Sequence, residues 1–495
     1  MNRRKFLHST TLAGAALATG QVHAAPKFAD ASWQSLPRWR GFNLLEKFIR
    51  GVHDAPFEES DFDIIAEWGF NFVRLPCDYR IWTEAPGHYR EAPLKEIDRA
   101  IRLGRERGIH VLLNLHRAPG YTVAKPQPEK LDLWADDTGG EEARRQFAAQ
   151  WQMFAERYRG IPSRELSFNL VNEPPRIPAE KYIRACAAAV EAIHRADPDR
   201  LVLADGLEYG HIPVPELKAL RIGQCTRGYD PIQLSHYRAD WIKGSKNYPL
   251  PTWPMLTHPT AFLCGNLKKD LQSPLILQGN FPAGTKLALH LTRLSASPHL
   301  VIKADGQTLL QRSFATTPEN HQPEVTDVLE TELSATAQEI SIAVEKGDWL
   351  KWQELHIAPP AQPVTRLRSL DKWGGKPGTW VIGPDGVAQC ASGNKIECDR
   401  DVLWNRSVEP WIKLRDSGVG VMVGEWGCHN RTPHPVALAW MRDCLANWQR
   451  ANFGWALWNL RGSFGVLDSE RKDVAYENFR GHKLDRQMLE LLRAG

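Results

Sequence analysis

Two acidic side chains each follow directly on a short apolar run, at positions where a carboxylate can do chemistry. Residues 166–171 form a mostly apolar, strand-forming run that leads into Glu173, and Pro174 then blocks further strand pairing because it lacks a backbone donor. Residues 419–423 form a second apolar run, which leads into Glu425. Burying a carboxylate at the end of a strand is costly unless a site uses it. Two carboxylates that face each other can hydrolyse a glycosidic bond, because one protonates the leaving oxygen while the other attacks or activates water.

The two runs belong to a longer alternation of strand and helix patterns. Helical patterns occur, among other places, at residues 94–107, 182–196 and 437–449. Strand patterns occur at residues 40–45, 70–76, 109–115, 166–171, 200–205, just before Tyr229, at 419–425 and at 453–460. Eight strands that alternate with helices predict an α/β fold, the (β/α)8 TIM barrel. At the mouth of such a barrel the carboxyl ends of different strands meet, so Glu173 and Glu425 are expected to face each other there.

Other polar and aromatic residues end further predicted strands. Arg74 ends the second strand, His116 follows the third, and Trp458 lies in the eighth. Asp205 and Glu208 end the fifth strand and are runner-up candidates for the catalytic carboxylates. Each residue also has an ordinary structural explanation, such as a surface ion pair for the arginine or core packing for the tryptophan.

Taken in order, these motifs resemble those of glycoside hydrolase family 5, the cellulase and mannanase family of (β/α)8 barrels. The resemblance rests on Asn172-Glu173-Pro174 and Gly424-Glu425-Trp426-Gly427, and it covers most of residues 38–265 and 365–480. It implies a retaining glycosidase, in which Glu173 is the general acid and then the base, and Glu425 is the nucleophile.

The resemblance also implies roles for the residues around the two carboxylates. Arg74 and Tyr229 are expected to keep the nucleophile ionised, and Asn172 is expected to bind the sugar 2-hydroxyl. His116 is expected to bind the adjacent hydroxyls, and Trp458 to stack against the sugar ring. The resemblance implies no metal and no organic cofactor.

The sixth strand departs from the family pattern, which is commonly His-x-Tyr-x-Pro-x-x-Phe-Thr-His. In the preferred alignment, Tyr229 and His236 match, and Arg227 stands where the family has the first His. A second alignment makes His236 the strand-six His and leaves Arg238 in place of the Tyr. The first is preferred because it also accounts for Pro231. Arg227, Tyr229 and His236 are all predicted to line the substrate site, with the substrate preference left open.

Between the sixth and seventh strands the helical period disappears. Residues 271–358 contain short alternating strand patterns separated by turns, which predicts a β-sandwich. We therefore expect an inserted sandwich at residues 270–360, with the barrel formed by residues 27–265 and 361–495. Trp349, Trp352 and His356 offer a sugar-binding platform, but packing is the preferred explanation because tryptophan is readily buried.

The N-terminus has the features of a bacterial twin-arginine signal over residues 1–24. Arg3-Arg4 precedes a mild apolar run at residues 10–19 and a small-residue cleavage site near Ala24. This predicts export to the periplasm or beyond; a basic, disordered N-terminus is the alternative. The apolar run is too short to span a membrane. The small net charge of +4, with interspersed signs, argues against a nucleic-acid partner.

Eight cysteines allow disulfides in an exported protein, but the sequence does not determine their pairing. Cys390 and Cys398 flank a turn and are the favoured pair. Cys77 and Cys225 are expected to be packed thiols, and no Cys/His cluster has the spacing of a structural zinc site.

The sequence thus predicts retaining hydrolysis of a β-glycosidic bond in a cellulose-type β-glucan, with polysaccharide or oligosaccharide as the partner. β-Mannan, β-1,3-glucan and xyloglucan remain alternative substrates, because a fold does not choose among them. A carbohydrate-binding barrel with weak or no activity is the alternative from another class, and Arg227 in place of a His favours it.

Overall fold

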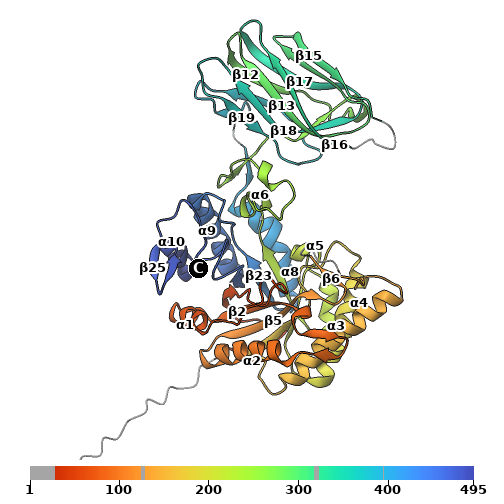
Figure 1. The fold of residues 1–495 in the computed structure, drawn as a ribbon, viewed down its shortest axis with the longest axis vertical. Coiled ribbons are helices and arrows are strands. Elements are labelled where there is room, and N and C mark those ends of the chain that lie inside the picture. The colour runs from red at the N-terminus through yellow and green to blue at the C-terminus, as the bar shows by residue number, and fades with distance from the viewer. Residues whose placement is uncertain (1–27, 124–128, 317–322, 394) are drawn as a thin grey trace, which may run out of the picture.

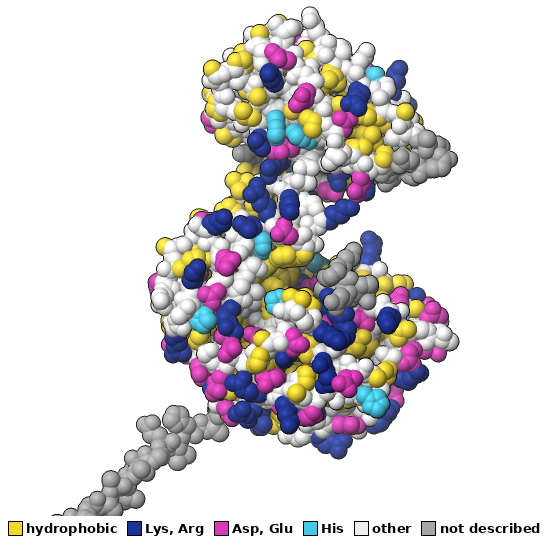
Figure 2. Space-filling view, viewed as in Figure 1, with side chains coloured by type: hydrophobic (Ala, Val, Ile, Leu, Met, Phe, Trp, Pro, Cys, Tyr) yellow, Lys and Arg dark blue, Asp and Glu magenta, His cyan; other side chains and the backbone are white. Residues whose placement is uncertain are grey.

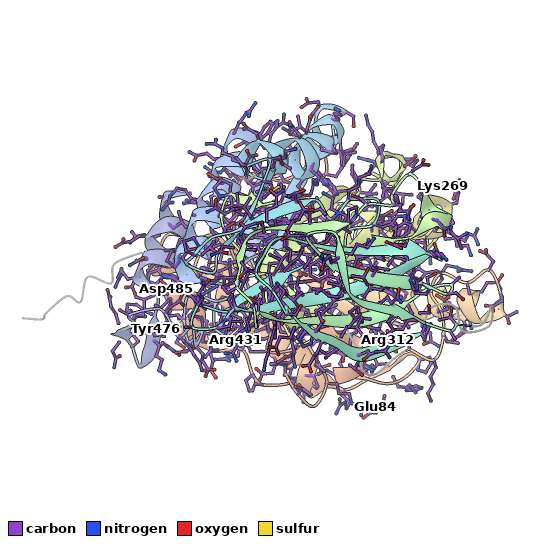
Figure 3. The ribbon with its side chains drawn as sticks, turned by 90° about the horizontal axis from the view of Figure 1, so that it is seen from above. Glu84, Lys269, Arg312, Arg431, Tyr476 and Asp485 are labelled. Carbon is purple, nitrogen blue, oxygen red and sulfur yellow. The ribbon has the colours of Figure 1, made fainter. Side chains whose placement is uncertain are left out.

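The structure is a computed structural model that describes residues 28–123, 129–316, 323–393 and 395–495. The predicted signal peptide at residues 1–24 lies outside these ranges. Two parts are arranged along the longest axis, a barrel with helices around it and a sheet-rich part above it (Figure 1). Seen from above, the sheet-rich part lies over the barrel (Figure 3). A narrow neck joins the two parts (Figure 2).

In the described part of the chain, eight parallel strands close into a barrel, which confirms the predicted fold class. Each strand pairs with the next in the order given, and the last pairs with the first. They are β1 (Arg40–Asn43), β2 (Phe72–Asp78), β5 (His110–Ala118), β7 (Leu166–Asn169), β8 (Val202–Asp205), β9 (Gly223–Gly228), β23 (Val421–Trp426) and β24 (Gly454–Leu457). The barrel strands are buried almost throughout, because helices cover them outside and side chains fill them inside.

Amphipathic helices form the outer layer of the barrel. In α2, for example, Leu94, Ile97 and Ile101 recur at helical spacing and are buried against the strands. The helices are α1 (Glu59–Glu67), α2 (Glu91–Glu106), α3 (Thr138–Arg157), α4 (Ala179–Ala196), α5 (Leu207–Gly210), α6 (Ile232–Ser235), α7 (Arg400–Leu403), α8 (Glu409–Asp416), α9 (His434–Ala451) and α10 (Arg486–Ala494). Between β8 and β9 the connection has only the short α5 and a 3-10 turn at Pro215–Leu220, since Pro213 and Pro215 do not suit a helix interior.

The part inserted between β9 and β23 is a β-sandwich, as predicted, with its own apolar core. One sheet contains β11 (Phe262–Cys264), β13 (Lys286–Leu294), β16 (Glu324–Glu332), β18 (Trp349–Ala358) and β19 (Thr365–Arg368). The other contains β12 (Leu275–Phe281), β14 (His299–Ala304), β15 (Gln307–Ser313), β17 (Ala337–Lys346), β20 (Thr379–Ile382) and β21 (Ala388–Cys390). The predicted range 270–360 is therefore too short. It misses β11 and β19 to β21, because strands of three or four residues between Gly/Pro turns show no clear alternation.

A two-stranded antiparallel stem connects the sandwich to the barrel. It pairs β10 (Met255–Leu256) with β22 (Ile396–Cys398), and the Thr257 amide donates to the Lys395 carbonyl at 2.9 Å. Small hairpins elsewhere pair β3 (Thr83–Ala85) with β4 (His88–Tyr89) and β25 (Glu477–Phe479) with β26 (His482–Leu484), and β6 (Tyr121–Thr122) extends the barrel sheet. The stem brings both ends of the insertion together.

Trp349 and Trp352 are both buried rather than forming an open platform. Trp352 is fully buried and donates from Nε1 to the Thr260 carbonyl at 3.1 Å, and Trp349 is 7% exposed. His356 is half-buried and lies 3.1 Å from a carboxylate oxygen of Glu354. The packing explanation that we preferred for the two tryptophans therefore agrees with the structure.

Because the stem holds the two ends of the insertion together, the sandwich can be removed at the stem. We expect a chain in which residues 258–394 are replaced by an Asn-Gly turn to keep a folded barrel, because the sandwich and the barrel have separate apolar cores. Calorimetry on the full chain and on the excised chain is the measurement, and the barrel transition should persist within a few degrees.

The matched control removes residues 270–360 instead, which takes β18 away from β11 and β19, and β12 away from β20. That chain is expected to aggregate, because unpaired strand edges and exposed apolar side chains remain. Loss of the barrel transition in the 258–394 excision would contradict the view that the barrel folds independently.

The cysteines do not form the favoured disulfide. All eight lie within the described ranges, and none of them is bonded to another. Cys390 belongs to β21 in the sandwich, whereas Cys398 belongs to β22 in the stem, so the two lie in different sheets although they are close in sequence. Cys77 and Cys225 are buried thiols, as predicted, and burial raises the pKa of both.

Within the described residues, no helix has both the length and the apolar character that crossing a bilayer requires.

Candidate active site

Glu173 is held in a strained backbone conformation just beyond the carboxyl end of β7. Its φ is 49°, in the left-handed region that costs a residue other than glycine on the order of 1–3 kcal/mol. Its amide donates to Asp205 Oδ2 at 2.9 Å, and the Tyr121 hydroxyl donates to its carbonyl at 2.6 Å. Hydrogen bonds on both sides of the residue thus fix the direction of the carboxylate, as expected where strain serves a site.

Glu425 lies near the carboxyl end of β23, with its side chain 3% exposed. Its Oε1 accepts from Arg74 Nη1 at 2.5 Å and from Arg227 Nη2 at 3.2 Å. Its Oε2 accepts only a longer bond, from the Tyr229 hydroxyl at 3.3 Å. Two guanidinium groups therefore hold the charge at Oε1, and Oε2 is the less encumbered oxygen.

Arg74 is fully buried and its donors are all directed into the barrel mouth. Besides Glu425, it donates to Asn43 Oδ1 and Asn169 Oδ1, each at 3.0 Å, and to Asn172 Oδ1 at 2.9 Å. A surface ion pair, the ordinary alternative for this residue, is thereby excluded. The fixed positive charge next to Glu425 is the arrangement that the resemblance implied.

Arg227 was predicted only to line the substrate site, but it contacts three carboxylates. It lies on β9 directly opposite Glu425 in the register of β9 with β23. Its Nε donates to Glu173 Oε1 at 3.0 Å, and its Nη2 donates to Glu425 and also pairs with Asp205. One buried guanidinium thus contacts both predicted catalytic carboxylates. The preferred alignment of the sixth strand agrees with this placement, because Tyr229 also contacts Glu425.

The two runner-up acids are engaged elsewhere. Asp205 is completely buried and accepts from Asn169 Nδ2 at 3.0 Å as well as from Glu173 and Arg227. Glu208 pairs with Arg176 at 3.2 Å, in a pair whose arginine is largely exposed. Asp205 therefore supports the two glutamates, and Glu208 makes a surface pair.

The electrostatics of Glu173 suit a general acid. Burial and the charge of Glu425 raise the pKa of Glu173 to about 7, against the lowering effect of Arg227. A carboxylic acid that keeps its proton near neutral pH can act as a general acid. Burial, and to a lesser extent the charge of Glu425, raises the pKa of Tyr229 well above its usual range. The Tyr229 hydroxyl therefore keeps its proton and stays a donor.

An aromatic group also lies at the barrel mouth, where Trp458 follows β24, the strand next to that of Glu425. Trp458 is half-buried, with its ring 5.6 Å from His116 and 5.4 Å from Phe48 between centroids. Burial and the charge of Arg74 lower the pKa of His116 well below its usual range, so the imidazole is neutral. Its Nε2 lies 3.4 Å from Asn172 Nδ2. Trp458, His116 and Asn172 therefore lie close together, and Phe48, a loop residue beside them, was missed by the sequence analysis.

His236 lies further from the two glutamates than predicted. Among the described residues, no contact joins it to Glu173 or Glu425. Its ring packs against Tyr229 at 4.9 Å, and its Nδ1 lies 3.0 Å from Ser235 Oγ. Trp241, another residue that was missed, is 58% exposed and has its ring 6.1 Å from that of His236. An exposed indole beside polar side chains is suited to stack against a sugar ring. The position of Trp241 in the loop after the sixth strand was the sequence feature from which it could have been predicted.

No group of three or more His, Cys, Asp or Glu side chains in the described ranges is arranged to hold a metal ion.

Comparison with known proteins agrees with this arrangement. The cellulase family, glycosyl hydrolase family 5, matches residues 30–234. Endoglucanase C of Acetivibrio thermocellus is 30% identical over 210 residues, which are 41% of this chain and 58% of that protein. The chain thus aligns with little more than half the length of this relative.

Two further comparisons extend the match. A probable glucan 1,3-beta-glucosidase A of Aspergillus terreus is 29% identical over 174 residues, 32% of this chain and 38% of that protein. A crystal structure of a glycoside hydrolase is 28% identical with a TM-score of 0.60, covering 92% of this chain and 99% of that one. The motifs, the closed barrel and these matches together show that residues 30–234 match glycosyl hydrolase family 5 and that the chain is similar to glycoside hydrolases.

Proposed function

We propose that this protein is a retaining glycoside hydrolase that cleaves β-glycosidic bonds in a β-glucan of the cellulose type. The observation that carries the proposal is the pair Glu173 and Glu425 at the barrel mouth, both contacted by the guanidinium of Arg227. One head group that contacts both carboxyl groups supports a short separation, close to the ~5–5.5 Å of retaining enzymes rather than the ~6.5–9.5 Å of inverting ones.

In the first step, Glu425 Oε2 attacks the anomeric carbon while Glu173 gives its proton to the leaving oxygen. The C–O bond to the leaving group breaks, and a glycosyl ester forms on Glu425. Arg74 supports this step because its bond to Oε1 stabilises the carboxylate before attack and later stabilises its departure. The Glu173 pKa of about 7 supplies the proton at neutral pH.

In the second step, Glu173 is a carboxylate and takes a proton from the water that attacks the glycosyl ester. The bond to Glu425 breaks, and the sugar is released with its original configuration. Asn172, His116 and Trp458 lie together beside the carboxylates, where they are placed to bind the hydroxyls and one face of the ring. The neutral His116 suits a hydroxyl, because it can donate or accept a hydrogen bond.

Cellulose-type β-1,4-glucan is the first substrate that we propose, because an endoglucanase relative aligns over 210 residues, against 174 for the glucan 1,3-beta-glucosidase. β-1,3-Glucan is the second, since a relative named for that linkage matches as well. Product analysis on β-1,4-glucan, β-1,3-glucan, xyloglucan and β-mannan tests the choice. Cleavage of none of them, together with measurable binding, would favour a non-catalytic carbohydrate-binding barrel.

The pH dependence follows from the raised pKa of Glu173. This group must be protonated in the first step, so kcat/KM on an oligosaccharide is expected to fall as the pH rises through about 7. A profile measured from about pH 4 to about pH 9 checks this. An aryl glycoside with an activated leaving group is the control, because such a group departs without a proton and should not show the fall. An oligosaccharide profile that stays flat above neutral pH would contradict the role of Glu173.

We also propose that residues 1–24 direct export by the twin-arginine route. The support is the sequence pattern around Arg3 and Arg4. Replacing both with lysine is expected to stop export while leaving the purified enzyme active, and cell fractionation measures it. Unchanged export of the double variant would show that another route is used.

A further inference from the structure

Arg227 places one permanent positive charge among three carboxylates, the buried Asp205 and Glu425 and the part-buried Glu173. Its side chain has no exposed surface, and its Nε lies 3.0 Å from Glu173 Oε1. Its Nη2 lies 3.2 Å from Glu425 Oε1 and 2.9 Å from Asn172 Oδ1, and it also pairs with Asp205. The residue that the family pattern has here is histidine, which is neutral or charged according to pH, whereas a guanidinium is always charged.

Such a charge creates a problem for the acid. A guanidinium next to Glu173 favours its ionised form, and the proton that Glu173 must deliver would be lost at a lower pH. Asp205 counteracts this effect, because it is completely buried and bonds both Arg227 and the Glu173 amide. With Glu173 protonated, the guanidinium groups of Arg74 and Arg227 balance the carboxylates of Glu425 and Asp205.

The reaction moves negative charge between the two residues that Arg227 contacts. When the glycosyl ester forms, Glu425 loses its charge, and Glu173 gains one as its proton leaves with the departing oxygen. When water hydrolyses the ester, Glu173 takes a proton from the water and Glu425 becomes a carboxylate again. The total charge is the same at each stage, and only its position within reach of Arg227 changes.

Building on the proposed function, we propose that Arg227 is a positioning residue that stays paired with whichever catalytic carboxylate is charged, and that Asp205 is the counter-ion that permits this. Arg227 can act on either carboxylate with little movement, since Nε faces Glu173 and Nη2 faces Glu425. The guanidinium thereby stabilises the existing charge of one carboxylate and the developing charge of the other. Because it is already in position, solvent does not have to reorganise.

The surroundings of Glu173 support the proposal. The titratable groups that act on it or contact it lie on several strands and loops of the barrel: Glu425, Arg227, Asp205, Tyr121, Tyr229 and His211. Of these, Arg227 lowers the pKa of Glu173, whereas Glu425 and Asp205 raise it. Arg227 and Asp205 therefore have opposite effects on the same proton.

A double-mutant cycle on the full-length protein tests this, with the pH profile of kcat/KM on an oligosaccharide as the readout. The alkaline limb is the fall of kcat/KM at high pH. Asp205→Asn is expected to shift this fall to a pH lower by about one unit, because Arg227 then acts on Glu173 without its counter-ion. Arg227→Gln is expected to move that limb up by about as much and to lower kcat. In the double variant the two shifts should largely cancel.

The double variant also leaves no unpaired charge from this ion pair, so it remains informative where a single variant folds poorly. Arg227→Lys should keep the limb near its original pH but lose part of kcat, because an ammonium cannot bridge two carboxylates. If all four variants lose activity with the alkaline limb unmoved, the pair is merely structural and the proposal is wrong. A wild-type enzyme that cleaves no glycan would refute the proposed function instead, so the two failures are distinguishable.

Discussion

Replacing Glu425 with glutamine is expected to abolish cleavage of every substrate, with kcat falling by roughly 10⁴-fold or more. The amide has the shape of the carboxylate but cannot form the glycosyl ester, so the loss is independent of the leaving group. The glutamine also leaves Arg74 and Arg227 facing a neutral group. Initial rates on an oligosaccharide and on an activated aryl glycoside measure the effect, and both should fall equally.

Glu165→Gln is the matched control, because Glu165 precedes β7 at the opposite end of the barrel and pairs with Arg105 at 2.7 Å. The same chemical change there should leave the rates unaltered, since the amino ends of barrel strands serve stability rather than catalysis. Retention of substantial activity in Glu425→Gln would mean that this residue is not the nucleophile.

Replacing Glu173 with alanine is expected to separate the two classes of substrate. On oligosaccharides, kcat/KM should fall by about 10²–10⁴-fold, because the leaving oxygen is no longer protonated. On an aryl glycoside with an activated leaving group, the first step should proceed almost normally, and the glycosyl ester should accumulate because no base activates water.

Azide should then restore turnover of the aryl glycoside. It is a nucleophile that needs no general base, and alanine leaves space for it where the carboxylate was. The product is expected to be a β-glycosyl azide, which NMR identifies, because attack on the ester inverts the anomeric centre for a second time. An α-glycosyl azide, or equal losses on both substrates, would contradict the assignment of Glu173.

The parts of the site that could be predicted from the sequence are those that local pattern determines. Glu173 and Glu425 follow apolar runs, and the order of the motifs placed Arg74, His116 and Trp458 at strand ends. The barrel itself follows from the alternation of strands and helices. Each of these depends on residues that are close together in the chain.

What could not be predicted depends on pairing between distant segments. The contact of Arg227 with Glu425 follows from the register of β9 with β23, two strands separated by the whole sandwich. Phe48 reaches the site from a loop and Tyr121 from the two-residue strand β6, and neither segment has a periodic signal. Proximity in sequence was misleading for Cys390 and Cys398, because the chain passes from one sheet to another between them.

The proposed mechanism requires a covalent intermediate on Glu425, which a fluorinated substrate can trap. In a 2-deoxy-2-fluoro cellobioside the fluorine slows both steps, because it destabilises the oxocarbenium-like transition states and removes the 2-hydroxyl contact. The activated leaving group restores the rate of ester formation only, so the ester accumulates. Mass spectrometry of the intact protein should show one added glycosyl group, and digestion should place it on the peptide that contains Glu425. Glu425→Gln should take up no label. An adduct on Glu173 or Asp205, or turnover of the reagent without any adduct, would contradict the account.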